Sequence, residues 1–83
     1  MKDHENTIKN LNCEITDNFT QKAFLYNALI HYIVFRHGGN EFVYSCSDKG
    51  SYVLSRFIDN KDKIILATQD YEKMERAIQN LWQ

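Results

Sequence analysis

The chain has 83 residues, and its ten Lys and Arg residues are balanced by eleven Asp and Glu residues, for a formal net charge of −1. This charge argues against strong attraction of the whole surface to nucleic acid or to anionic lipid. The length fits one small domain over residues 1–83, and 43% apolar with 13% aromatic residues is typical of a folded chain.

The N-terminal residues 1–7 are polar, and we expect them to be flexible. They contain no apolar segment of the secretory type, and no later stretch is long and apolar enough to span a bilayer, so we expect a cytoplasmic protein without a membrane partner. The two cysteines, Cys13 and Cys46, are too few for a disulfide scaffold. We interpret them as free thiols of a reducing compartment, although one bridge is geometrically possible.

Residues 10–15 alternate in polarity, with Leu11, Cys13 and Ile15 on one side, which predicts a short strand. The segment Asn18–His37 then has two interpretations. Capping residues at its start, apolar residues at helical spacing and Gly38 after its end all favour one long helix. In the alternative, the helix ends near Leu29, His31–Arg36 is a strand rich in β-branched and aromatic residues, and Gly38-Gly39 is a hairpin tip. We favour the long helix because its three signals agree.

Three further strands are predicted at Glu41–Ser47, Ser51–Ile58 and Lys63–Thr68, separated by tight polar turns. A final helix, capped by Thr68 or Asp70, follows. Its apolar stripe consists of Tyr71, Met74, Ile78, Leu81 and Trp82. The predicted fold class is α+β, in the order (β)-α-β-β-β-α, with an antiparallel three- to four-stranded meander packed against two helices.

The chain shows no pattern of catalytic or metal-ligating residues. Cys13, His31, His37 and Cys46 have none of the spacings typical of a zinc site. Cys46 shares a strand face with Phe42 and Tyr44, which favours burial over reactivity. We therefore predict no catalytic residue, no metal, no cofactor and no enzymatic activity.

The predicted α-β-β-β-α order is similar to that of double-stranded-RNA-binding domains. That family binds phosphates with a basic cluster at the start of its last helix, whereas the segment Thr68–Lys73 places Asp70 and Glu72 before its only lysine. A second route to nucleic acid is a sheet face that stacks bases. This alternative function would use Tyr44, Tyr52 and Arg56, with Lys49 and Lys63 nearby.

The leading hypothesis is a protein-binding module. The long helix would carry a second apolar stripe, formed by Phe24, Ala28 and Phe35, which one sheet cannot cover. We therefore expect another protein, or a second copy in a homodimer, to cover it. The predicted role is that of a small inhibitor or regulator, of the kind encoded by phages and mobile elements, which blocks a larger protein by steric occupation. The predicted contact residues are Phe24, Tyr32, Phe35, Tyr44, Tyr52 and Arg56.

Overall fold

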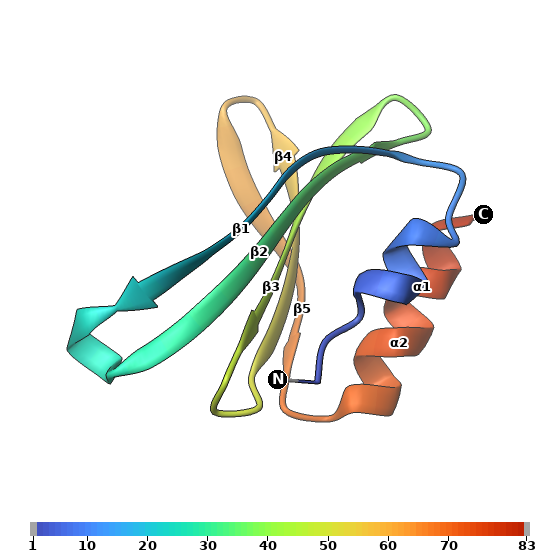
Figure 1. Cartoon of the computed structure of the whole chain (residues 1–83). Helices are drawn as coiled ribbons and strands as arrows, with labels where there is room; N and C mark the ends of the chain where they lie inside the picture. Colours follow the sequence, from blue (N-terminus) through green and yellow to red (C-terminus); the bar gives the residue numbers. More distant parts are fainter. Residues whose placement is uncertain (1, 83) are drawn as a thin grey trace.

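The computed structural model of the chain describes residues 2–82, apart from the side chain of Trp82. It shows an α+β fold in which a five-stranded antiparallel sheet carries short helices on one face (Figure 1). The elements are α1 (Glu5–Lys9), β1 (Glu14–Ala23), the 3-10 turn η1 (Phe24–Tyr26), β2 (Ala28–His37), β3 (Asn40–Ser47), β4 (Tyr52–Ile58), β5 (Lys61–Thr68), α2 (Tyr71–Gln79) and the 3-10 turn η2 (Asn80–Trp82).

The sheet is a simple meander in which every strand pairs with its neighbour in the sequence, in the order β1-β2-β3-β4-β5. Its inner face packs against α1 and α2, and the core lies between these two layers. The predicted class and the antiparallel meander are confirmed at this level, while the number of strands and the position of the first helix differ from the prediction. The core residues are Ile8, Leu11, Ile33, Phe35, Phe42, Tyr44, Cys46, Tyr52, Leu54, Met74 and Ile78.

The long helix predicted over Asn18–His37 is wrong, because this segment forms a hairpin of two ten-residue strands, β1 and β2. In β2, Ile33 and Phe35 are buried while Val34 between them points to the opposite face. Their period of two, together with a run of β-branched and aromatic residues, outweighs the helical spacing of the apolar residues. The strand that the alternative placed at His31–Arg36 is observed within β2, but the shorter helix that it kept up to Leu29 is not.

Gly38 and Gly39 form the two-residue turn between β2 and β3, not the end of a helix. Both have a positive φ, 59° and 79°, and the flanking residues His37 and Asn40 are paired in the ladder. Two successive positive φ values belong to the hairpin turn whose twist matches that of the strands it joins. The hairpin interpretation of these glycines is therefore the correct one.

The three later strands and the last helix agree with the prediction to within two residues at each start. Asp70 is the N-cap of α2, since its carboxylate accepts a hydrogen bond from the backbone N–H of Lys73 at 3.2 Å. Met74 and Ile78 are fully buried, and Leu81 packs against the core from η2. The predicted place of Trp82 on this apolar stripe lies outside the described side chains.

The N-terminal segment, expected to be flexible, packs against the rest of the molecule. His4 and Ile8 are fully buried, and α1 lies against α2 (Figure 1). Leu11 and Cys13, predicted to lie in a strand, instead belong to the connection from α1 to β1 and still face the core. Over the described residues, no helix is long and apolar enough to cross a membrane.

Candidate functional site

The turn between β1 and β2 carries three large apolar side chains in succession, and all three face solvent. Phe24, Leu25 and Tyr26 are 84%, 93% and 76% exposed, respectively. Asn27 closes this turn with a left-handed backbone, φ 47°, which asparagine adopts more readily than most residues. Single exposed apolar residues are ordinary, but a contiguous group marks an interaction site. We call Phe24–Tyr26 the hairpin tip.

The hairpin tip stands clear of the sheet on a short two-stranded ribbon. β1 and β2 pair out to Ala23 and Ala28, whereas β3 begins to pair with β2 only at Ile30. Asp48 braces the ribbon at this point: its backbone N–H donates to the Leu29 carbonyl at 3.0 Å, and its carboxylate accepts from the Leu29 N–H at 3.2 Å. Figure 1 shows the ribbon extending away from the helices. Backbone hydrogen bonds therefore hold the tip in place without burying it.

A groove of about 490 Å³ lies directly beside the tip. Tyr26 forms one wall, and Ala28 and Ile30 of β2 continue it. The opposite wall comes from the end of β3 and the turn that follows, namely Ser47, Lys49 and Ser51. The projecting hairpin tip and the groove therefore lie side by side. Together they form a surface that a protein of complementary shape could contact.

The groove continues onto the face of the sheet that no helix covers, which we call the uncovered face. Val43 alternates with the buried Phe42 and Tyr44 and so points to this face, as does its register partner Val34. Tyr32 stacks on Phe19 here, with ring centroids 5.1 Å apart. By the same alternation and register, the large apolar side chains of the uncovered face include Phe19, Ile30, Tyr32, Val34, Val43, Val53, Phe57 and Ile64.

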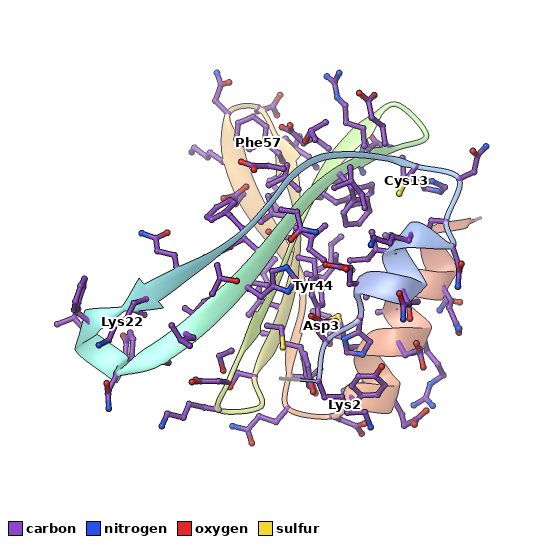
Figure 2. All side chains as sticks on the ribbon, in the orientation of Figure 1. Lys2, Asp3, Cys13, Lys22, Tyr44 and Phe57 are labelled. Atoms are coloured by element: carbon purple, nitrogen blue, oxygen red, sulfur yellow. The ribbon has the colours of Figure 1, made fainter. Side chains whose placement is uncertain are left out.

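Two lysines flank the hairpin tip. The ammonium group of Lys22 lies 5.6 Å from the centre of the Phe24 ring, and Lys49 lines the groove. Figure 2 shows Lys22 on the projecting ribbon. The nearby carboxylate of Asp48 already accepts a backbone hydrogen bond. Two lysines and one carboxylate thus leave an excess of one positive charge beside the tip, on a chain whose net charge is −1.

The six predicted contact residues do not form one surface, because the helix that grouped them is absent. Phe24 lies in the hairpin tip and Tyr32 lies on the uncovered face, at positions that a partner can reach. Phe35, Tyr44 and Tyr52 are buried in the core beneath the helices. Their burial removes these three from the candidate surface and corrects their predicted exposure.

Arg56 lies on the helix side of the sheet, at the end remote from the hairpin tip. Its Nη2 donates to Oδ1 of Asn40 at 2.5 Å. The aromatic partners expected beside it for base stacking, Tyr44 and Tyr52, are covered by the helices and cannot stack on a base in this fold. The predicted sheet face for nucleic acid is thus not assembled from these residues.

Leu25 and Tyr26 are the contact candidates that sequence reasoning missed. The long helix predicted over Asn18–His37 would have spaced these two side chains along a helix and not side by side in an exposed turn. The available signal was Asn27 after three apolar residues, since asparagine adopts the left-handed conformation that closes a turn.

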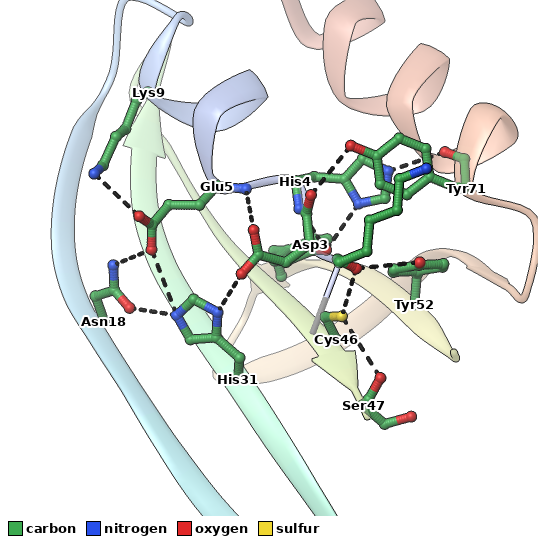
Figure 3. A network of polar contacts seen from close by, with 12 residues as sticks. Asp3, His4, Glu5, Lys9, Asn18, His31, Cys46, Ser47, Tyr52 and Tyr71 are labelled. Carbon is green, nitrogen blue, oxygen red and sulfur yellow. Dashed lines mark hydrogen bonds and ion pairs between the residues drawn. The ribbon is translucent and has the colours of Figure 1, made fainter. Parts of the chain in front are cut away.

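A buried polar cluster fixes the N-terminal segment to the core (Figure 3). Nε2 of His4 lies 2.9 Å from the carbonyl oxygen of Tyr71, which only accepts, so this nitrogen carries the proton. Nδ1 then accepts from the hydroxyl of Tyr44 at 2.8 Å, and the same hydroxyl accepts from the backbone N–H of His4 at 3.0 Å. The ring of His4 also stacks on that of Tyr71, at 4.0 Å between centroids. Each polar atom of this cluster therefore has a partner.

His31 forms a second polar link between β2 and the N-terminal segment. Its Nδ1 lies 2.9 Å from Oδ2 of Asp3, and its Nε2 lies 2.5 Å from Oδ1 of Asn18. The Asn18 amide donates to Oε1 of Glu5 at 2.9 Å, which turns its oxygen toward the histidine. Both ring nitrogens thus face side-chain oxygens that can accept a hydrogen bond. These contacts link β2 to the N-terminal segment and to β1.

The two thiols form no disulfide; Cys46 is buried and Cys13 is partly exposed. Burial raises the pKa of the Cys46 thiol, and burial also raises the pKa of the Cys13 thiol. Burial is likewise the main cause that raises the pKa of Tyr44. Such thiols are weak nucleophiles near neutral pH. Within residues 2–82, no three potential metal ligands converge.

Comparisons of the chain with protein-family models, with curated proteins and with solved structures gave no match.

Proposed function

We propose that this protein is a binding module that inserts its hairpin tip into an apolar pocket of a larger protein and so blocks that surface by steric occupation. The carrying observation is the contiguous exposure of Phe24, Leu25 and Tyr26 on a braced ribbon. Lys22 and Lys49 at the rim favour a partner with carboxylates around the pocket. The role is that of an inhibitor or regulator and requires no catalysis.

The tip alone does not supply enough free energy for tight binding. Burying each large apolar side chain contributes about 1.5–3 kcal/mol, so three contribute roughly 5–8 kcal/mol. Association costs about 4–15 kcal/mol in lost translational and rotational freedom. The groove and the uncovered face must therefore contribute as well, and we expect an interface of about 800 Å² per partner.

The shape of the site favours a protein partner over a lipid surface. A bilayer would receive the tip but leave the adjacent groove and the uncovered face without contacts. Those features bring Val34, Val43 and the stacked Tyr32 into reach of a surface that follows the sheet. A folded protein can match all three features at once.

Photo-crosslinking tests this proposal. A photoreactive residue replaces Leu25, and a matched one replaces Glu72, which is exposed on α2 at a distance from the tip. The partner captured only from position 25 is purified, and its affinity is measured by calorimetry. We expect F24S/L25S/Y26S to weaken binding at least about 1,000-fold, or about 4.1 kcal/mol, with little dependence on salt.

Gln79→Ser is the control, since Gln79 is exposed on α2, on the other side of the sheet from the uncovered face. It should bind within about twofold of the unmodified chain, since single residues outside a binding hot spot contribute little. The proposal is wrong if the triple variant binds like the unmodified chain. Binding of the tip to phosphatidylcholine–phosphatidylglycerol vesicles, without a captured protein, would also overturn it.

A further inference from the structure

A second cavity, of about 480 Å³, opens at the end of the sheet remote from the hairpin tip. Its volume falls in the range of small-molecule sites. Its lining combines apolar side chains, from Phe42, Ile65 and Leu81, with nitrogen donors, from Arg56 and the amides of Asn40 and Asn80. Ile65 reaches the cavity because it is the residue left unpaired where the β4–β5 register shifts. No carboxylate is among the described residues that line it.

Arg56 is the lining residue that carries a positive charge and an unmatched hydrogen-bond donor. Its Nη2 donates to Asn40 at 2.5 Å, but its Nε is buried and has no hydrogen-bond acceptor among residues 2–82. None of the ion pairs formed by the described residues includes Arg56. Buried polar groups are normally paired, so a guanidinium with an unmatched donor and no counter-charge is unusual for a purely structural arginine.

The neighbours of Arg56 hold it in place without neutralising it. Asn40 donates from its amide nitrogen to the Gly38 carbonyl at 3.3 Å, which directs its oxygen to the guanidinium. Lys63 lies directly opposite Arg56 in the β4–β5 register, and like charges in that position repel. The adjacent acid, Glu41, pairs in register with Arg36 and Phe57 and therefore points to the opposite face.

His37 adds an imidazole ring to the lining of the cavity. Its Nδ1 lies 3.2 Å from the Asn12 carbonyl oxygen, and its Nε2 lies 2.7 Å from that of Leu81. The lining thus combines the positive charge of Arg56 and amide groups with apolar side chains.

The geometry points to a binding site for a small organic carboxylate with a flat apolar body. The guanidinium of Arg56 receives the carboxylate, since its planar fork matches two carboxylate oxygens. Phe42, Ile65 and Leu81 cover the apolar body. An anion without such a body, such as inorganic phosphate, leaves the apolar half of the cavity without contacts.

Titration with benzoate, followed by ¹H–¹⁵N NMR of the full chain, tests this site. We expect saturable shifts at Gly38, Asn40 and Asn80, with a Kd of about 1 mM, which a ligand of this size can reach. Benzamide, the neutral isostere, should bind at least about tenfold more weakly, or about 1.4 kcal/mol. Inorganic phosphate should give no comparable shifts.

Arg56→Gln should weaken benzoate binding at least about tenfold, by the loss of a charge-assisted pair. Arg36→Gln is the matched control, because it removes the same charge from an exposed position outside the cavity. If Arg56→Gln loses the dispersed spectrum of the folded chain, Arg56→Lys keeps the charge but removes the fork, and it should still weaken binding.

Three results would overturn the inference: no saturable shifts with benzoate, equal binding of benzamide or phosphate, or equal weakening by Arg36→Gln. The outcome is independent of the hairpin tip, because the two sites lie at opposite ends of the sheet.

Discussion

Replacing His4 by alanine should destabilise the fold far more than a polar residue near a chain end normally does. The substitution leaves the Tyr44 hydroxyl without its acceptor and the Tyr71 carbonyl without its donor. It also removes a ring that is only 1% exposed and stacks on Tyr71. The perturbation thus combines two lost hydrogen bonds with a small cavity.

The free energy of unfolding should fall by about 3 kcal/mol. A buried group left without its partner costs about 1–3 kcal/mol, a lost neutral hydrogen bond about 0.5–1.5 kcal/mol, and a lost aromatic contact about 0.5–1.5 kcal/mol. These costs sum to about 2–6 kcal/mol, and partial relaxation around the cavity keeps the total in the lower half of that range. Typical stabilities of about 0.05–0.15 kcal/mol per residue imply roughly 4–12 kcal/mol for 83 residues, so the loss is a large share of the whole.

Urea denaturation followed by circular dichroism measures this change. With an m-value of about 1 kcal/mol/M, the midpoint should fall by about 3 M. Asn6→Ala, in the same helix but exposed, is the control and should change stability by less than about 0.5 kcal/mol. A double-mutant cycle with Tyr44→Phe should show a coupling of about 1 kcal/mol. If His4→Ala costs no more than Asn6→Ala, the N-terminal segment is not part of the core and this reasoning fails.

Three further predictions concern titration and the hairpin turn. Burial raises the pKa of the Cys46 thiol. The protonated thiol therefore stabilises the fold fully below the ordinary thiol pKa of about 8.5. This stabilisation is lost as the pH rises through the pKa of Cys46 in the folded protein. In timed alkylation with mass spectrometry, Cys46 should therefore react after the partly exposed Cys13, and the reverse order would contradict its burial. Hydrogen bonds from Asn18 and Lys9 lower the pKa of Glu5. The ionised carboxylate therefore stabilises the fold above the ordinary carboxyl pKa of about 4.3. This stabilisation is lost as the pH falls through the pKa of Glu5 in the folded protein. Glu5→Gln should flatten the fall in melting temperature between neutral and acid pH, and an unchanged acid slope would exclude this link. Gly39→Ala should cost about 1 kcal/mol in urea denaturation, because φ is 79° there although the space around the added methyl is open; a neutral result would show that the turn relaxes.

The second half of the chain could be predicted from the sequence because its signals do not conflict. Glu41–Ser47 alternates without interruption, Gly50 follows a polar turn, and Asp70 precedes an amphipathic stripe. Each of these is a local feature, and each is observed in the fold. Short-range patterns therefore sufficed for β3, β4, β5 and α2.

The first half could not be predicted because its apolar residues fit two periods at once. Ile30, Ile33 and Val34 fit one face of a helix. The continuous apolar run from Tyr32 to Phe35 fits equally well a strand with apolar side chains on both faces. The choice depends on β3, which pairs with β2 over eight positions, and on Asn27, which turns the chain. Both effects are tertiary or conformational and override helix propensity.

The candidate site, too, could be predicted only in part from the sequence. Phe24 and Phe35 were both selected from the second apolar stripe of the predicted long helix, and Phe24 is exposed for another reason, its place in the turn between β1 and β2, while Phe35 is buried. Tyr44 and Tyr52 were misplaced because the sequence does not show which sheet face the helices cover. The covering helix α1 has only five residues, which is too short to give a periodic signal. Its position depends on His4, whose partners lie at least 40 residues away in the sequence.

The packing of α1 against α2 has a consequence for the order in which the protein assembles. The sheet consists of hairpins between neighbouring strands, so it can form from local contacts. The helical layer joins the two ends of the chain, through the side chains of Thr7 and Glu75 and through His4 and Tyr71. During synthesis, the inner face of the sheet must therefore wait for α2 to emerge before α1 can close over it. Until then, Phe35 and Phe42 lie open on a half-covered sheet, and this interval is when the chain most needs protection from aggregation.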